Sequence, residues 1–423
     1  MKATFRSLRT YNYRLWASGA IVSNVGTWMQ RTAQDWLVLT ELTHHDATAV
    51  GIVMALQFGP QAVLLPITGY AADRFDRRKV LMATQAAMGC LAAGLGLLTV
   101  LHLVQLWQVY VFALLLGIVS AFDIPARHTF VSDMVPAEDM SNAVALNSAS
   151  FNAARLVGPA TAGLTIAAIG TGWAFLANGL SFAAVLTSLF FLRRADIRVR
   201  ERKSASQTKF ADGLRLIARR PDLRAIAAMY FLIGTFGLNY PIFISTMAVT
   251  VFHKGAGQFG ILTSTLALGS VTGALLSAGR PALKFGYLLI GATAFGLGSL
   301  LAAGMPSYWL FGLALATVGL AAQTFSTTAN GLAQMTVPSD QRGRVMAIMM
   351  AVFNGGTPLG APFVGWIANR FGPRCALLAA VFGGLGAAAV ALVYLIRHRR
   401  LRLTMSGFRL TVGYDNGLEK GAD

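Results

Sequence analysis

The sequence is poor in charged residues and in cysteine. Only 12% of its 423 residues are charged while 55% are hydrophobic, whereas soluble proteins carry about 25% charged residues. A soluble core could not hide so much apolar surface, which excludes an ordinary soluble globular protein. The two cysteines, Cys90 and Cys375, lie in or beside apolar runs without metal-ligand spacing, which argues against a disulfide framework and a zinc site.

Several functional motifs are also missing. There is no Gly-x-x-x-x-Gly-Lys phosphate loop, which argues against ATP as the energy source. The six histidines are scattered, and no serine or cysteine stands in the context of a nucleophile. The net charge of +18 could suggest nucleic acid, but the basic residues lie between apolar runs and not on one soluble domain. We therefore expect no enzyme activity, no metal, no cofactor and no nucleic-acid partner.

Long apolar runs take the place of these features. A membrane-spanning helix needs about 20 mostly apolar residues, and the 44 glycines would let such helices pack closely. We predict an all-α membrane protein with twelve transmembrane helices in two pseudo-symmetric six-helix bundles. The predicted spans are 15–40, 48–72, 79–101, 105–127, 141–169, 172–192, 224–250, 256–279, 284–304, 307–333, 343–369 and 374–396.

Composition divides the chain into five parts. The basic segment 1–14 has no cleavage site behind a short apolar core, so we expect no removable signal peptide. The linker is polar and basic, and we expect a short surface helix in it near 210–218. The parts are an N-terminal segment (1–14), an N-terminal bundle (15–192), a linker (193–223), a C-terminal bundle (224–396) and a tail (397–423).

Lys and Arg are distributed unevenly between alternate connecting segments. Of the 35, 30 lie at the N-terminus, in every second connection and in the tail, three lie in the other connections, and two lie within spans. Since cytoplasmic loops carry the excess of Lys and Arg, both termini and the linker are predicted to be cytoplasmic. The expected location is the inner membrane of a bacterial cell.

The two halves also repeat. With a shift of 202 residues, nine of 47 positions are identical, and the pairs Val135-Pro136 and Phe151-Asn152 fall on Val337-Pro338 and Phe353-Asn354. Parallel half repeats with a site near the membrane midplane are a known plan of secondary transporters.

Three motifs resemble the major facilitator superfamily. The first lies between spans 2 and 3, with Asp76 where the family usually has glycine. The second, in span 5, is similar to a motif of antiporters but has Ala154 and Ala162 as departures. The third is similar to the branch of siderophore and macrolide exporters of the enterobactin-exporter type. The first motif is Gly69-x-x-x-Asp73-Arg74-x-x-Arg77-Arg78-Lys79, and the second is Ala154-x-x-x-Gly158-Pro159-x-x-Ala162-Gly163. The third motif comprises residues 122–127, followed by Val135-Pro136 and residues 142–147.

The first motif is the predicted inner gate. Asp73 would lie against the start of span 11, where backbone N–H groups favour an anion, and Arg77 would pair with Asp123. The alternative is a loop that only marks the cytoplasmic side. The gate residues are Gly69, Asp73, Arg74, Arg77, Arg78, Lys79, Asp123 and Arg127.

Three ionisable residues fall inside predicted spans, which is rare and typical of a bundle interior or an aqueous cavity. Arg31 and Asp35 are four residues apart and share a face of span 1, and Arg155 lies in span 5. Asp35 would carry the coupling proton, while Arg31 or Arg155 would bind an anionic substrate group or tune Asp35. The alternative is a structural Arg31–Asp35 pair.

Uncharged polar residues are the candidate lining of a substrate cavity. Each could instead form an interhelical hydrogen bond. The clear intramembrane charges are confined to the first half, which suits a coupling half and a permissive substrate half. The candidates are Asn24, Gln30, Gln34, Asn152, Asn239, Tyr240, Gln323, Asn330 and Asn354.

Span 5 carries the small residues Gly158 and Gly163 around Pro159. The resemblance implies close packing on span 8 that seals the inner side of an exporter, whereas the alternative is a simple kink. A second kink is expected in span 7 at Pro241.

We therefore expect a monomeric secondary transporter that exports a small amphipathic compound, a siderophore or drug, in exchange for protons. The lipid bilayer and the small-molecule substrate are its expected partners, and the proton gradient is its energy source. Proton symport of a metabolite into the cell is the alternative within transport. A receptor or scaffold on a transporter fold is the alternative outside it.

Overall fold

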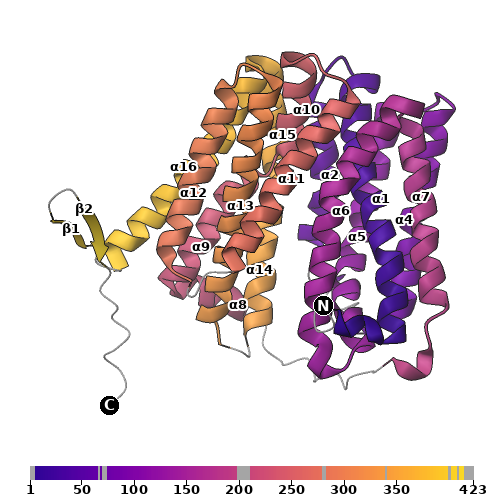
Figure 1. Ribbon diagram of the computed structural model, residues 1–423, viewed down its shortest axis with the longest axis horizontal. Coiled ribbons are helices and arrows are strands. Elements are labelled where there is room, and N and C mark those ends of the chain that lie inside the picture. The colour runs from indigo at the N-terminus through magenta and orange to yellow at the C-terminus, as the bar shows by residue number, and fades with distance from the viewer. Residues whose placement is uncertain are drawn as a thin grey trace.

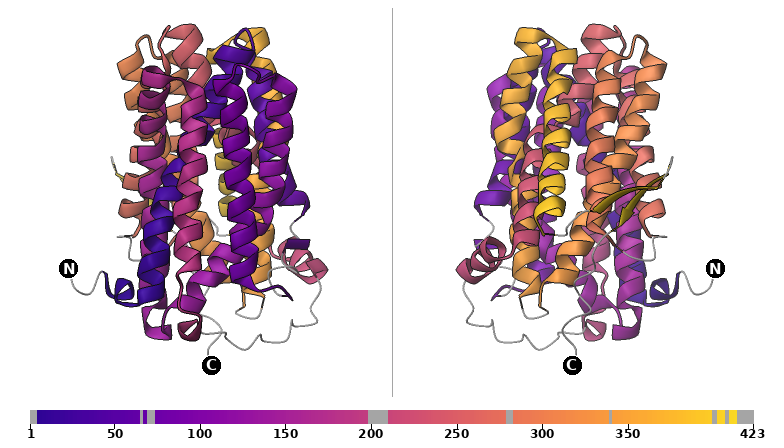
Figure 2. Two further views of the ribbon diagram at one scale, coloured as in Figure 1. Left: turned by 90° about the vertical axis from the view of Figure 1, so that its right-hand side faces the viewer. Right: turned by 90° about the vertical axis from the view of Figure 1, so that its left-hand side faces the viewer.

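The computed structural model describes residues 5–64, 67–68, 74–197, 210–278, 283–338, 341–398, 402–406 and 409–413. Long helices run nearly parallel to one another through the height of the molecule (Figures 1 and 2). In Figure 1, the helices of the first half of the chain stand on the right and those of the second half on the left.

The first half begins with a short 3-10 helix and alternates long helices with short connections. Its elements are η1 (Arg6–Arg9), α1 (Tyr11–Trp36), η2 (Leu37–Leu42), α2 (Ala47–Val63), α4 (Arg77–Val100), α5 (Leu106–Met134), η3 (Ala137–Asp139), α6 (Met140–Ile169), α7 (Thr171–Phe190) and η4 (Arg194–Asp196).

The second half starts at α8 (Phe210–Arg219), which confirms the short helix predicted in the linker. The kink predicted near Pro241 is also confirmed, because π-helical turns and a break separate α9 from α10. The elements are α9 (Pro221–Leu232), η5 (Ile233–Gly237), α10 (Tyr240–Thr246), η6 (Met247–Val251), α11 (Ala256–Ala278), α12 (Phe285–Gly304), α13 (Tyr308–Thr336), α14 (Arg342–Gly355), α15 (Thr357–Phe371) and α16 (Pro373–His398).

The tail contains an element that the sequence interpretation missed. Two short strands, β1 (Arg402–Ser406) and β2 (Arg409–Gly413), pair as an antiparallel hairpin with Thr404 opposite Thr411. Outside this hairpin, the regular secondary structure of the described residues is helical, in agreement with the predicted all-α fold class.

Within the described ranges, nine helices are long and apolar enough to cross a membrane. Two of them are composite, since Pro221–Val251 joins α9 to η6 and Arg342–Phe371 joins α14 to α15. The helices α1 and α6 are 26 and 30 residues long but carry the intramembrane charges Arg31, Asp35 and Arg155. The helix α2 is apolar but has only 17 described residues.

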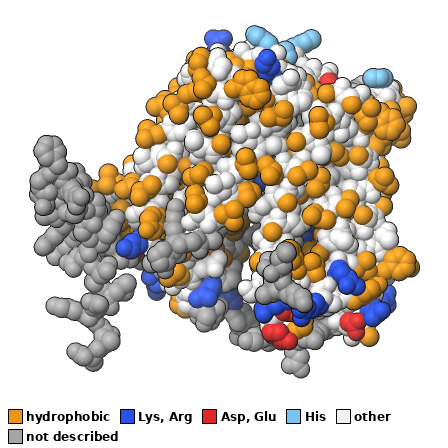
Figure 3. All heavy atoms as spheres, viewed as in Figure 1, with side chains coloured by type: hydrophobic (Ala, Val, Ile, Leu, Met, Phe, Trp, Pro, Cys, Tyr) orange, Lys and Arg blue, Asp and Glu red, His pale blue; other side chains and the backbone are white. Residues whose placement is uncertain are grey.

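The two ends of the molecule differ in charge. One end, which we call the basic face, carries η1, the start of α4, the end of α5 and α8. The other end, the distal face, carries the turns at 43–46, 101–105, 252–255 and 305–307. Figure 3 shows Lys, Arg, Asp and Glu gathered at the basic face, with a broad hydrophobic band above it.

The helix bounds reproduce the repeat seen in the sequence. The helix α5 spans 106–134 and α13 spans 308–336, while α6 spans 140–169 and α14 with α15 spans 342–371, so each pair is offset by the predicted 202 residues. The next turns match as well, because Gly170 and Gly372 have φ of 95° and 91°. This left-handed conformation is accessible to glycine at no steric cost, so the two turns can have the same shape.

Candidate functional site

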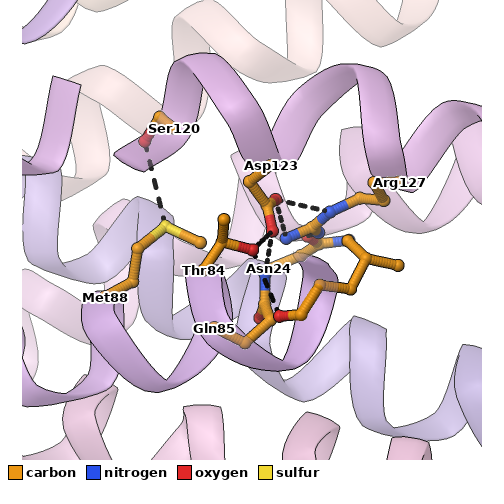
Figure 4. A network of polar contacts seen from close by, with 8 residues as sticks. Asn24, Thr84, Gln85, Met88, Ser120, Asp123 and Arg127 are labelled. Atoms are coloured by element: carbon orange, nitrogen blue, oxygen red, sulfur yellow. Dashed lines mark hydrogen bonds and ion pairs between the residues drawn. The ribbon is translucent and has the colours of Figure 1, made fainter. Parts of the chain in front are cut away.

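A buried carboxylate lies at the centre of a polar network in the half of the molecule nearer the basic face. Asp123 on α5 accepts hydrogen bonds from Thr84 Oγ1 (2.8 Å) and Gln85 Nε2 (2.7 Å) of α4. It also accepts from Arg127 Nε (3.1 Å) and NH2 (2.9 Å). Arg127 NH1 donates to Asn24 Oδ1 of α1 at 3.0 Å. Figure 4 shows how these side chains converge from three helices.

This network corrects the predicted pairing of Arg77 with Asp123. Arg77 instead forms an ion pair with Asp133, ten residues further along α5, at 2.6 Å. Asp123 is 3% exposed and Asp133 is 5% exposed, so each needs a nearby cation. Each aspartate has its own arginine. Arg77, at the start of α4, pairs with Asp133, and Arg127, one turn further along α5, pairs with Asp123.

The other described residues of the predicted gate fix helix ends. Arg78 donates to the carbonyls of Leu189 (2.9 Å) and Phe190 (3.1 Å) at the end of α7, where a cation suits the negative end of the helix. Asp76, which stands where the family usually has glycine, is the N-cap of α4 and accepts from the backbone N–H groups of Arg78 and Lys79. This capping gives the departure from the motif a structural reason.

Gly69, Asp73, Arg74 and Lys79 are the other residues of the predicted gate. Gly69 and Asp73 lie outside the described residues, so the expected contact of Asp73 with the start of span 11 stays a prediction. Arg74 lies just before α4, and Lys79 lies in its first turn.

The two intramembrane arginines meet at one tryptophan ring. The Cζ of Arg31 lies 5.0 Å from the centroid of the Trp28 ring, and the Cζ of Arg155 lies 5.7 Å from it. Arg31 also faces Phe58 of α2 at 5.4 Å, and Phe151 of α6 contacts Trp28 edge-on at 5.7 Å. The helices α1, α2 and α6 thus build an aromatic and cationic cluster.

The cluster reaches the second half of the chain and includes the predicted proton carrier. Asp35 and Arg155 lie close enough to Arg31 to act on its charge, and the hydroxyl of Tyr240 on α10 lies close to Arg155. Within the described ranges, none of the ion pairs involves Arg31, Asp35 or Arg155. The direct Arg31–Asp35 pair, which was the structural alternative, is not formed. We call Trp28, Arg31, Asp35, Arg155 and Tyr240 the central cluster.

Seven of the polar candidates lie outside both the Asp123 network and the central cluster. Four are engaged in other hydrogen bonds: Gln30 accepts from Asn178, Asn152 donates to Ser148 O, Asn239 donates to Thr235 O and Gln323 donates to Thr327. Gln34 is 2% exposed, and its amide nitrogen makes no hydrogen bond in the described part of the chain. Asn330 lies in α13, and Asn354 lines a cavity.

That cavity, of about 700 Å³, lies between the two halves of the chain, in the half of the molecule nearer the basic face. Its walls come from the end of α2, the second half of α5 and most of α14. Its polar residues are Gln61 and Thr68 from the first half of the chain, His128 on α5, and Arg344 and Asn354 on α14. Gln61 lies one helical turn from Phe58, so α2 runs directly from the cavity wall to the central cluster.

The opposite half is closed by contacts between α2 and α15. Asn369 on α15 donates to Asp46 Oδ1 (2.6 Å) and Thr48 Oγ1 (2.9 Å), and it accepts from the backbone N–H of Ala47 (2.8 Å). A Cβ on Gly365 would lie 2.4 Å from the carbonyl oxygen of Ala47, so glycine allows the two backbones to touch. These contacts join the two halves at the distal face.

The helix α6 meets α11 in a second seam, which confirms the predicted packing of span 5 on span 8. A Cβ on Gly163 would lie 2.6 Å from Ala256 O, and a Cβ on Gly260 would lie 2.3 Å from Pro159 O. Because α6 ends and α11 begins at the distal face, the seam closes the distal half. The expectation that it seals the side of the basic face is wrong in this structure. Gly158 packs instead on α1, against Trp28 and Val25.

Sequence interpretation missed the aromatic partners and the distal contacts. Trp28 lies three residues before Arg31, so it shares the helix face of that arginine, and this spacing could have indicated it. Asp46 and Asn369 carried no such signal, since they are 323 positions apart and only the folded chain brings them together.

Comparison with known proteins identifies the family. The family model MFS_3, described as transmembrane secretion effector, matches residues 2–405. Two relatives are each 26% identical to the chain. The Staphyloferrin A transporter of Staphylococcus aureus aligns over 92% of this chain and 96% of its own, and Enterobactin exporter EntS of Escherichia coli aligns over 87% and 88%.

Solved structures agree on the fold. A bacterial homolog to the human lysosomal transporter Spinster, in an inward-facing and occupied conformation, superposes with a TM-score of 0.73 at 14% identity and covers 91% of this chain and 96% of that one. A D-xylose-proton symporter superposes with a TM-score of 0.70 at 13% identity and covers 92% and 98%.

Proposed function

Because the chain belongs to the major facilitator family of transmembrane secretion effectors, we propose that it exports a small amphipathic compound, a siderophore or drug, by alternating access. The names of the two relatives support a siderophore as the substrate. In this proposal twelve helices cross a bacterial inner membrane, the protein acts as a monomer, and the basic face lies in the cytoplasm, as the excess of Lys and Arg there favours.

The observation that carries the proposal is the placement of the central cluster between a closed and a hollow half. Residues of α1, α6 and α10 meet in it, and these helices come from both halves of the chain. The distal half is closed by α2–α15 and α6–α11 contacts, while the half near the basic face holds the cavity of about 700 Å³. With the basic face in the cytoplasm, this state would receive substrate from inside the cell.

We further propose that Asp35 carries the coupling proton and that the proton gradient drives export. A carboxylate that alternates between an apolar setting and a nearby guanidinium can take up and release a proton in turn. Asp123 is less suited to this role, because Thr84, Gln85 and Arg127 already bind its carboxylate within the first half of the chain.

Efflux from inverted membrane vesicles with an imposed pH gradient tests the proposal, with a panel of siderophores and drugs. We expect Asp35→Asn to abolish gradient-driven efflux while substrate binding survives. Asp196→Asn on η4 at the basic face, which removes a carboxylate far from the cluster, is the matched control and should transport normally. Gradient-dependent efflux in Asp35→Asn would place the coupling proton elsewhere.

Proton symport into the cell is a second candidate, and the charges of the central cluster favour it for an anionic substrate. Arg31 lies close to both Asp35 and Arg155 there, so protonation of Asp35 leaves the cluster more positive. An anion and a proton would then bind together, as symport requires, whereas exchange requires that each weakens the binding of the other.

A further inference from the structure

The central cluster contains more positive charge and more hydrogen-bond donors than its own residues can satisfy. Arg31 and Arg155 both lie over the Trp28 ring, at 5.0 and 5.7 Å from its centroid. Like charges this close repel each other, and the effect of Arg155 on Arg31 is of that sign. The ring faces attract both cations, but an aromatic face cannot accept the in-plane N–H groups of a guanidinium.

Three donors in and around the cluster are buried without a partner. They are Nε of Arg31, Nε2 of Gln34 and the hydroxyl of Tyr240, and none of them makes a hydrogen bond within the described ranges. A buried donor that makes no hydrogen bond is costly, so such donors are uncommon in folded proteins. Gln34 lies three residues from Arg31 on α1, and Tyr240 approaches from α10 beside Arg155.

The one acidic group nearby does not meet this demand. Asp35 acts on Arg31 electrostatically but forms no ion pair with it in the described part of the chain. A cluster that served only to hold α1 to α6 would be expected to close this pair, because an unpaired buried charge is costly. The missing component is a group that accepts several hydrogen bonds and carries negative charge.

We propose that the central cluster binds a carboxylate of the transported compound, with Arg31 and Arg155 as the cations and Trp28 and Phe58 as the faces for its flat apolar part. Guanidinium groups bind carboxylates through two parallel hydrogen bonds, and the amide of Gln34 and the hydroxyl of Tyr240 supply further donors. The inference rests on the proposed transport function and names the substrate class as aromatic or amphipathic carboxylates.

A matched pair of probes tests the site directly. We would titrate the purified full-length protein in lipid nanodiscs with 2-naphthoate and with 2-naphthamide, which share the ring system and differ in charge, and would measure binding by calorimetry. The expected result is that naphthoate binds at least about tenfold more tightly than naphthamide. Equal binding of the two probes, or no binding of either, overturns the proposal.

Variants assign the preference to the two arginines. Arg31→Gln and Arg155→Gln should each remove the preference for naphthoate, whereas Arg370→Gln, at an exposed arginine near the distal face, should keep it. Arg31→Lys and Arg155→Lys keep the charge and should retain part of the preference, which separates loss of the site from loss of folding. A preference that survives both Gln variants also overturns the proposal.

The vesicle assay distinguishes failure of the site from failure of the transport function. Charge-selective binding without efflux or uptake of any panel compound would keep the carboxylate site and refute transport of the proposed class. Efflux without charge-selective binding would keep the transporter and refute the carboxylate site.

Discussion

At the scale of single residues, two buried aspartates of α5 have separate arginine partners near the basic face. Arg77 binds Asp133, and Arg127 binds Asp123 one turn away on the same helix. The first pair ties the start of α4 to the end of α5, and the second belongs to the network with Thr84, Gln85 and Asn24. Neither pair crosses to the second half of the chain, so each stabilises the first half in itself.

Double-mutant cycles should reproduce this assignment. We expect the pairs Arg77–Asp133 and Arg127–Asp123 to show coupling energies of about 1–3 kcal/mol, because each single substitution removes one partner of a buried ion pair. The cross pair Arg77–Asp123 should couple by less than about 0.5 kcal/mol, as independent sites do. The measurement is the free energy of unfolding in mixed micelles for Gln and Asn variants. Strong coupling of the cross pair would restore the gate contact expected from the motif.

At the scale of elements, close backbone contact at glycines helps to close the molecule at the distal face. The helix α11 approaches α6 at Gly260, where a Cβ would lie 2.3 Å from Pro159 O, whereas a Cβ on Gly257 one turn earlier would meet no atom within 4 Å. Close approach of this kind depends on small residues at the contact. A larger side chain at position 260 should therefore widen the seam between α6 and α11, whereas one at position 257 should leave it intact.

This contrast gives a matched pair of substitutions. Gly260→Ala should push α11 away from α6 and destabilise the distal closure by about 1–3 kcal/mol, the usual cost of overpacking. Gly257→Ala on the same helix should change stability little. Thermal melting in nanodiscs measures the stability, and labelling of a cysteine placed at the distal end of α11 measures the opening. Equal effects of the two substitutions would contradict the seam.

The elements were far more predictable than their contacts. Hydropathy alone indicated α4, α5 and α12 to within a few residues of their ends, except where α5 continues past 127 to Met134, because lipid demands long apolar helices. Which aspartate pairs with Arg77 depends on how α5 is rotated and how far it extends, and no local pattern records that. The central cluster was partly predictable, since Arg31, Asp35 and Arg155 are exceptional inside spans, but the meeting of both arginines at Trp28 required the packing of α1 on α6.

At the scale of the whole molecule, the two ends have different roles in this state. The distal half is held shut by Asn369 and the two glycine seams, and the basic half holds the cavity. The central cluster lies between them, so either end could expose it. Alternating access then requires that the distal contacts break while α14 closes on α2 and α5 around the present cavity.

The sign of the linkage between proton and substrate then separates export by exchange from symport. Arg31 lies close to both Asp35 and Arg155, and Arg155 lies close to the Tyr240 hydroxyl. A proton on Asp35 therefore removes the only negative charge of the central cluster and favours an anion. Symport therefore predicts that 2-naphthoate binds more tightly as the pH falls, within the range in which the probe stays ionised, whereas the export by exchange proposed above predicts that it binds more weakly. In Asp35→Asn, binding of the probe should not depend on pH. Calorimetry of the full-length protein in nanodiscs measures both. Since linkage is reciprocal, tighter binding at low pH favours symport of a carboxylate with a proton, whereas weaker binding would show direct competition and favour exchange.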